Sequence, residues 1–300
     1  MQLSYVLVTT AYNEEQIIES TIKSVIHQTH LPKKWIIVSD GSTDRTDDII
    51  RKYAEKYQFI IYERQEKRDI DKKRIEKASI AKSRSMKLAL KRLSDVEYDF
   101  IGNLDSDISF DSDYYEQVLS KFLNDSKLGI AGGGAFNVNP NGTLTGGGFI
   151  KTHFVGGPVQ LFRRECYEEI GGYQPYGRDD CIAVGTAKMK GWKVRCFPEI
   201  RAFHYGTPSN KVKEKVPDCF KMGQMDYIMG DFLIFQFIRC TIRAFKKPYI
   251  LAGMAMMAGY VWAFLTKRKK IPEKNLRKYM QSQQLSKLIS RLRSRGIKKK

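Results

Sequence analysis

The chain has 300 residues, of which 42% are hydrophobic and 12% aromatic, which excludes a disordered protein and suits one large or two small domains. Its formal net charge is +19, but the stretch from Lys246 to Lys300 holds sixteen Lys or Arg and one acid, a net charge of +15. The rest of the chain is therefore nearly neutral. A basic end on a neutral body predicts contact with an anionic surface, and membrane lipid headgroups fit this at least as well as nucleic acid.

The five cysteines form no C-x-x-C pair and are odd in number, which favours a reducing compartment over a disulfide framework. The first apolar run, Tyr5 to Thr10, is short and follows no basic region, so we expect no signal peptide. Both features are typical of a protein exposed to the cytosol.

Strands and helices are predicted to alternate over the first hundred residues. β-rich runs occupy 3–10, 35–38 and 59–62, and helical patterns follow the first two. A charged segment, 63–77, and a helix that carries Lys82 and Arg84 lead to a fourth apolar run, 99–104. This alternation is typical of βαβ units and predicts a mostly parallel, doubly wound α/β sheet.

Polar side chains follow three of these strands, and in a parallel sheet such strand ends lie along one ligand-binding edge. Asp105 and Asp107, at the end of the fourth strand, can face one divalent cation from the same side of an extended backbone, and that cation would hold a nucleotide diphosphate. Asp40 can accept hydrogen bonds from a base or ribose, while the main chain at Thr10 and Ala11 can meet the base. The alternative for each acid is a turn or helix cap.

Asp179 and Asp180 follow a turn at 176–178 and precede an apolar helix, so we place them at a helix N-terminus, where the helix dipole favours the ionised form. Displacement by a hydroxyl needs one carboxylate to take its proton, and because adjacent residues point apart, at most one of the two is that base. The alternative is a plain N-cap. His204, at the end of the run 194–203, is either a metal or diphosphate ligand or a hydrogen-bonded structural residue.

Glycine-rich runs on either side of the Pro-Asn-Gly turn at 140–142 predict a β-hairpin. Gly156 and Gly157 permit close approach of the backbone to a ligand, as an acceptor pocket would require, or simply tight core packing. The polar, Lys-rich segment 207–218 is expected to be a mobile loop that closes over a bound donor.

Taken in order, the segments 8–15, 39–44, 105–107, 156–157, 162–164, 170–173, 179–180, 191–194 and 204 resemble the motifs of family 2 glycosyltransferases with the GT-A fold. The resemblance covers roughly the first 205 residues and implies an inverting enzyme that uses nucleotide-diphosphate sugars. It implies Asp180 as the base, with Asp179 as the alternative because the family commonly has Glu-Asp here, and a Mn²⁺ or Mg²⁺ ion bound by Asp105, Asp107 and His204. The residues expected to bind the nucleotide sugar are Thr10, Ala11, Tyr12, Glu14, Asp40, Arg84, Asp105, Gly156 and Gly157.

The C-terminal region contains a stretch from Pro248 to Thr266 without a charged residue, which as a helix would measure roughly 28 Å, near the thickness of a bilayer core. Basic residues flank it at 246–247 and 267–270, so the positive-inside rule draws both ends toward the cytosol. Amphipathic patterns at 231–246 and 285–292 suit helices that lie in a membrane interface. The alternative is an ordinary helical subdomain packed on the catalytic core.

The sequence therefore predicts a GT-A catalytic domain at 1–225 and a membrane-associating helical region at 226–300. We expect a metal-dependent glycosyltransferase at the cytoplasmic face of the cell membrane, with a glycan or lipid-linked acceptor and no nucleic-acid partner. A nucleotidyltransferase of sugar-nucleotide synthesis is an alternative, although it would need a glycine-rich phosphate turn after the first strand. A nucleic-acid-binding protein is another, although its charge would then not be confined to one end.

Overall fold

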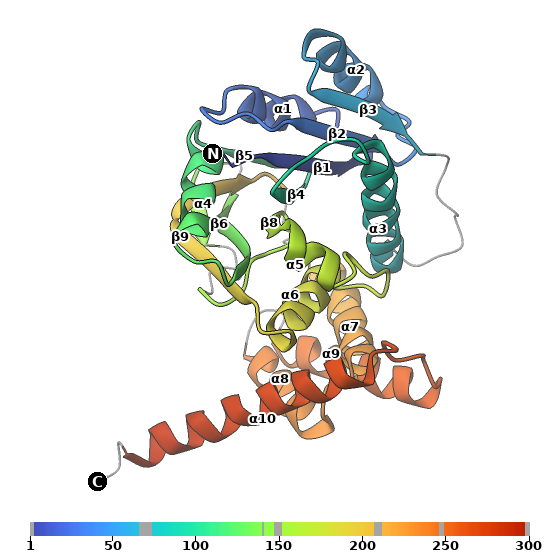
Figure 1. The fold of residues 1–300 in the computed structure, drawn as a ribbon. Helices are drawn as coiled ribbons and strands as arrows, with labels where there is room; N and C mark the ends of the chain where they lie inside the picture. Colours follow the sequence, from blue (N-terminus) through green and yellow to red (C-terminus); the bar gives the residue numbers. More distant parts are fainter. Residues whose placement is uncertain are drawn as a thin grey trace. The chain divides into compact units, whose positions relative to one another are not determined.

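A computed structural model describes residues 3–65, 74–139, 141–146, 152–206, 212–245 and 249–297 (Figure 1). The chain divides into two compact units, Met1–Thr207 and Pro208–Lys300. Residue 225, where the sequence placed the domain boundary, lies inside helix α7 (Val212–Met229). The bounds of the catalytic and membrane-associating regions therefore stay a prediction.

The first unit is built on one mixed sheet with the strand order β3-β2-β1-β4-β8-β6-β9-β5 and with β7 paired to β6. Its strands are β1 (Tyr5–Ala11), β2 (Lys34–Ser39), β3 (Ile60–Arg64), β4 (Phe100–Leu104), β5 (Ile108–Phe110), β6 (Leu128–Val138), β7 (Leu144–Gly146), β8 (Val159–Arg163) and β9 (Lys193–His204). Its helices are α1 (Ile18–Ile26), α2 (Thr46–Lys56), α3 (Arg74–Arg92), α4 (Tyr114–Leu123), α5 (Arg164–Glu169) and α6 (Asp179–Met189).

The doubly wound arrangement predicted from the sequence is confirmed. β1 pairs in parallel with both β2 and β4, so the chain first winds outward to β3 and then returns past β1. Because parallel crossovers are right-handed, this reversal places α1 and α2 on one face of the sheet and α3 on the other (Figure 1). The antiparallel pairing of β6 with β7 confirms the predicted hairpin, whose residue 140 lies outside the described residues.

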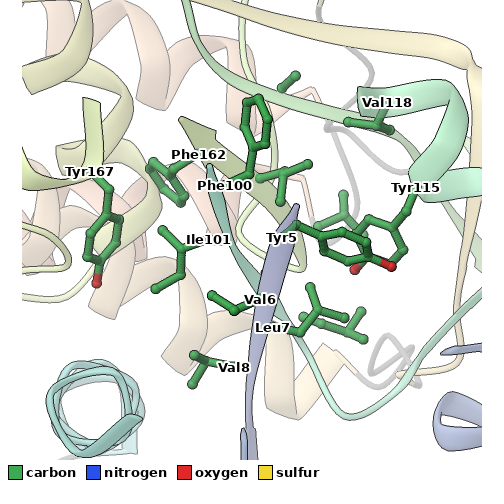
Figure 2. Close-up of a cluster of buried hydrophobic side chains, with 14 of the residues drawn as sticks. Tyr5, Val6, Leu7, Val8, Phe100, Ile101, Tyr115, Val118, Phe162 and Tyr167 are labelled. Atoms are coloured by element: carbon green, nitrogen blue, oxygen red, sulfur yellow. The ribbon is translucent and has the colours of Figure 1, made fainter. Parts of the chain in front are cut away.

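The core forms on both faces of the central strands because Tyr5–Val8 of β1 and Trp35–Val38 of β2 are apolar runs that are buried on both sides. Figure 2 shows Tyr5 and Leu7 on one side of β1, with Tyr115 of α4, and Val6 and Val8 on the other. The rings of Tyr5 and Tyr115 stack with their centroids 4.6 Å apart. This packing fixes the sheet whose edge carries the site.

Strand register brings the polar strand ends together. Ala11 at the end of β1 is paired with Ser39 at the end of β2, and Val8 is paired with Asn103 near the end of β4. The segments that follow these strands therefore emerge along one edge of the sheet, as the sequence predicted.

The second unit is helical, with α7 (Val212–Met229), α8 (Leu233–Ala244), α9 (Ile250–Leu265) and α10 (Lys274–Ile297). The predicted mobile loop at 207–218 is wrong from Val212 onward, where α7 begins, and residues 207–211 lie outside the described residues. The polar composition of this segment was misleading. The later part of α7 packs closely against α9, and the helix continues from there back to Val212 through the polar residues. In the part of the chain that the structure describes, no helix is long and apolar enough to cross a membrane.

Candidate active site

The turns that follow β1 and β2 are joined by hydrogen bonds at the sheet edge. Asn13 adopts a left-handed backbone conformation with φ of 55°, and its side-chain oxygen accepts a hydrogen bond from the Thr43 amide at 2.8 Å. In return, the amides of Asn13 and Glu14 donate to the hydroxyls of Ser42 at 3.2 Å and Thr46 at 2.8 Å. These reciprocal bonds hold the two turns as one rigid wall.

The residues predicted to bind the nucleoside lie along this wall. The backbone amide of Asp40 donates to the carbonyl of Ala11 at 2.9 Å, and Asp40 itself is buried. Thr10 is half-buried one residue before the end of β1, and Tyr12 is exposed just beyond it. The structure thus brings these residues together, while their contacts with a nucleoside stay a prediction.

Asp105 and Asp107 lie on a turn between β4 and β5, not on extended backbone as the sequence predicted. The Oδ1 atom of Asp105 accepts hydrogen bonds from the Lys82 ammonium at 2.9 Å and from the Asn103 amide at 3.0 Å. Burial raises the pKa of Asp105, but Lys82 and Asn103 outweigh it and hold this pKa below its ordinary value. Asp105 is therefore an ionised carboxylate tied to a cation of α3.

Asp107 is paired with His204 at the end of β9, with Oδ2 and Nε2 3.0 Å apart. The other ring nitrogen, Nδ1, lies 3.0 Å from the side-chain oxygen of Asn137 on β6. Strand register produces this arrangement, because His204 is paired with Asn137 on one side and with Ile108, the residue after Asp107, on the other. The Nδ1–H group thus donates a hydrogen bond to the side-chain oxygen of Asn137, and Nε2 is directed at Asp107.

The hydrogen bond with Asp107 raises the pKa of His204 above its ordinary value, and burial offsets only part of this effect. The chain passes close over the pair at Gly206, where a Cβ atom would lie 2.7 Å from Oδ2 of Asp107 and 2.8 Å from Nε2 of His204. Only glycine fits above the pair as it stands.

Glu14 faces the same group of acids from the turn after β1. Burial, followed by the negative charges of Asp107, Asp44 and Asp105, raises the pKa of Glu14 to about 7. Glu14 thus adds a further carboxyl group to the described acids at this edge of the sheet.

The predicted metal ligands Asp105, Asp107 and His204 do not all face the same point. Among the described residues, no three His, Cys, Asp or Glu side chains are grouped closely enough to hold a metal ion by themselves. Asp107 and His204 converge on one point, whereas Oδ1 of Asp105 is already bound to Lys82. Magnesium-type sites use one or two protein ligands and fill the remaining positions with water and substrate phosphates. Asp107 and His204 therefore fit a cation that binds together with a diphosphate.

The two candidates for the catalytic base, Asp179 and Asp180, are the first residues of helix α6. They follow directly after Arg178, which has a left-handed φ of 51°. Oδ2 of Asp180 accepts a hydrogen bond from the Gly157 amide at 3.3 Å. A Cβ atom on Gly157 would lie only 3.3 Å from that of Asp180, so this glycine lets the loop approach the carboxylate. Gly156 is buried beside it.

Asp179 has a different environment from Asp180. Its Oδ2 lies 3.9 Å from the ammonium of Lys82, and its side chain is only 14% exposed. Burial raises the pKa of Asp179, although Lys82 counteracts it. The Lys82 ammonium is thus shared between Asp105 and Asp179, whereas Asp180 accepts a hydrogen bond from the backbone amide of Gly157.

Among the described side chains of α3, Lys82 rather than Arg84 contacts the acids. The Lys82 side chain is 18% exposed, and the nearby Asp105 and Asp179 raise its pKa although burial opposes this. Arg84 is exposed, and its predicted place near the diphosphate stays a prediction. Helical periodicity could have identified Lys82, because it shares a face with the buried Ser85, Met86 and Ala89.

Asn103 and Asn137 were also missed. The Asn103 amide donates to the Gly157 carbonyl at 2.6 Å as well as to Asp105, so it joins the metal side of the site to the loop beneath Asp180. Neither asparagine stands in a motif, and no signal in the sequence marks them.

Comparison with known proteins shows what the chain as a whole is similar to. Residues 6–144 match the family model described as Glycosyl transferase family 2. The poly-beta-1,6-N-acetyl-D-glucosamine synthase of Staphylococcus aureus is 26% identical over 207 residues, which cover 62% of this chain and 46% of the synthase. The aligned region thus spans about half the length of this curated relative.

Two solved structures show the same fold. The mannosyltransferase PcManGT from Pyrobaculum calidifontis, in complex with GDP-Man and Mn²⁺, has a TM-score of 0.56 and 16% identity, with 97% of this chain and 88% of that chain covered. The S. aureus TarS fragment in complex with UDP-GlcNAc has a TM-score of 0.52 and 13% identity, with 88% and 73% covered. Residues 6–144 are therefore similar to glycosyl transferase family 2, and the first unit has the GT-A fold of these two structures, as the order of its sequence motifs predicted.

Proposed function

We propose that this chain transfers a sugar, with inversion at the anomeric carbon, from a nucleotide-diphosphate sugar to a hydroxyl of a glycan or lipid-linked acceptor. The observation that carries the proposal is the placement, in a domain with the GT-A fold, of Asp180 and Asp179 within reach of the Lys82 and Asp105 pair. That placement combines a carboxylate for proton transfer with charged groups for a diphosphate.

Asp180 is the proposed base. As the acceptor hydroxyl attacks, its oxygen forms a bond to the anomeric carbon, the bond from that carbon to the diphosphate oxygen breaks, and the hydroxyl proton passes to the Asp180 carboxylate. The electron pair of the broken bond leaves with the nucleoside diphosphate. The Gly157 amide, whose nitrogen lies 3.3 Å from Oδ2, fixes the orientation of the Asp180 side chain.

Lys82 keeps Asp105 ionised and holds it in place through its 2.9 Å ion pair. The same ammonium, 3.9 Å from Asp179, compensates one of the two adjacent acids at the start of α6. Asp180 is therefore the proposed acceptor of the proton, and Asp179 has a supporting role.

Asp107 and His204 are the proposed ligands of a divalent cation, with Asp105 as a further candidate. When bound, the cation would neutralise charge on the diphosphate leaving group. The closeness of Glu14 to Asp107 and Asp105 supports this role, and PcManGT, a protein of the same fold, was solved with Mn²⁺. Mn²⁺ and Mg²⁺ are both suitable for this donor set.

The acceptor and the place of action follow from two further observations. The S. aureus relative makes a polymer of N-acetyl-glucosamine, by its name, which supports a glycan acceptor. The net charge of +15 after residue 245 supports attachment to an anionic membrane surface. We therefore place the enzyme at the cytoplasmic face of the cell membrane, where it elongates a lipid-linked or cell-surface glycan.

Release of nucleoside diphosphate from a panel of UDP-, GDP- and dTDP-sugars, with Mn²⁺ or Mg²⁺, tests the proposal. We expect one donor to be turned over and the Asp107→Ala variant to lose most turnover and metal-dependent nucleotide binding. Asp111→Ala, which removes an exposed acid just after β5, is the matched control. An unchanged metal titration in a folded Asp107→Ala variant would contradict the metal assignment, and release of pyrophosphate would indicate a nucleotidyltransferase instead.

A further inference from the structure

The second unit exposes an unusual amount of apolar surface on helices α8 and α9. Ile234 and Phe237 of α8 are 72% and 64% exposed, and Trp262 and Leu265 of α9 are 52% and 68% exposed. We call this set the outer apolar face; its members on and beside the two helices are Phe232, Leu233, Ile234, Phe237, Ile242, Phe245, Tyr249, Ile250, Leu251, Met254, Val261, Trp262, Phe264 and Leu265. A helical unit packed for water would bury such residues.

The inward side of the same unit is polar. Gln236 of α8 is fully buried, and Arg239, one turn along, forms ion pairs with the buried Asp226 of α7 at 2.6 Å and with Asp231 at 3.0 Å. The side chain of Gln284 on α10 also donates to Asp231. Helix α8 is therefore amphipathic in the reverse sense, with its polar stripe inside and its apolar stripe outside.

Small residues let helices α7 and α9 approach closely. A Cβ atom on Gly223 of α7 would collide with the carbonyl oxygen of Met256, and one on Gly259 of α9 would collide with the carbonyl oxygen of Phe220. Glycine contacts between helices, polar groups paired inside and large apolar residues outside are the features of helices packed in lipid, where apolar burial does not drive association.

Charge beside the outer apolar face indicates which apolar surroundings it meets. Lys267, Lys269 and Lys270 follow directly after α9 and are exposed, except that Lys270 also lies over the Tyr227 ring. Arg243 lies in the last turn of α8. Cations beside an apolar face are complementary to anionic lipid headgroups above acyl chains, and not to a second apolar protein surface.

We propose that the outer apolar face inserts into the headgroup and acyl boundary of one leaflet of an anionic bilayer, with the polar interior of α7, α8 and α10 shielded from lipid. This deepens the membrane attachment proposed above by naming the surface and its orientation. It requires no glycosyl transfer, so its failure and that of the proposed reaction are measured separately.

Flotation of the full chain with vesicles tests the insertion. We expect the chain to float with vesicles of phosphatidylcholine and phosphatidylglycerol, and Phe237→Glu to weaken binding about tenfold or more, because one large apolar side chain no longer enters the lipid. Leu123→Glu is the matched control, since Leu123 is 67% exposed on α4 of the first unit and is expected to leave binding unchanged. Circular dichroism confirms that both variants are folded.

Trp262 reports the depth of insertion directly. We expect its fluorescence to shift to the blue on vesicle binding and to be quenched by brominated lipids, with both responses lost in Trp262→Phe. Binding that is abolished by high salt and is unchanged in Phe237→Glu would show a purely electrostatic contact and overturn the proposal. A second result would also overturn the proposal: the parent chain forms a dimer without detergent, does not bind vesicles, and becomes a monomer in Phe237→Glu. The outer apolar face would then contact a second copy of the chain.

Discussion

Replacement of Asp180 by Asn separates proton transfer from donor binding. The substitution keeps the size of the side chain and an oxygen that can accept the Gly157 amide hydrogen bond, but it removes the charge that takes up the proton. The Lys82 ion pairs with Asp105 and Asp179 remain, so the site should keep its shape.

The expected loss can be estimated from the role of the residue. A general base typically contributes 10²–10⁴-fold, which corresponds to roughly 3–5.5 kcal/mol of transition-state stabilisation. We do not expect the adjacent Asp179 to replace the base, because its Oδ2 lies 3.9 Å from the Lys82 ammonium. We expect kcat to fall by about that factor, while the affinity for the nucleoside diphosphate changes by less than about threefold.

Single-turnover transfer and calorimetric binding of the nucleoside diphosphate, measured on the same preparation, supply both quantities. Asp179→Asn is the matched control, and we expect it to affect stability and donor affinity more than the chemical step. A kcat of Asp180→Asn within tenfold of the parent would refute the assignment. A larger loss of kcat in Asp179→Asn would exchange the roles of the two acids.

Three further predictions concern the charges around this base. Because the pKa of Glu14 is raised to about 7, the free energy of unfolding of the metal-free protein should fall as pH rises from about 4.5 to 7. In urea unfolding, Glu14→Gln should therefore be more stable than the parent by roughly 1 kcal/mol at pH 8 but not at pH 4.5. Lys82→Met should cost about 2 kcal/mol at pH 7, with the difference shrinking below pH 4 as Asp105 is protonated; equal costs at both pH values would contradict this. Asn137→Ala should weaken Mn²⁺ binding about 10–100-fold by calorimetry, whereas the exposed Asn124→Ala should not.

Local patterns in the sequence predicted the first half of the sheet correctly. The apolar run before Asp105 and the turn residues after each strand are short-range signals, and they identified β1, β2, β4 and the edge where their ends meet. The hairpin of β6 and β7 was predicted for the same reason, since turn chemistry is encoded within a few residues.

Contacts between distant segments could not be predicted in this way. Asn137 and His204 are 67 residues apart, and their pairing depends on the register of β6 with β9, which is shifted by an irregularity between Gly133 and Gly134. The choice between Lys82 and Arg84 depends on how α3 is rotated against the sheet, which apolar spacing indicates only weakly. In α8, the polar stripe was recognised, but a pattern alone does not tell which stripe faces the other helices.

The central position of β1 has a consequence for how the protein folds. Val8 is paired with Ile36 of β2, 28 residues later, and with Asn103 of β4, 95 residues later. Closing the longer loop costs about 1 kcal/mol more chain entropy, so the β1 and β2 pair is expected to form before β4 joins it. Asp105 directly follows β4, so the hydrogen-bonded turns at Asn13 and Thr43 are expected to form before Asp105 reaches its place in the site. Recovery of nucleotide binding during refolding would therefore report the last stage of assembly of this domain, not its first.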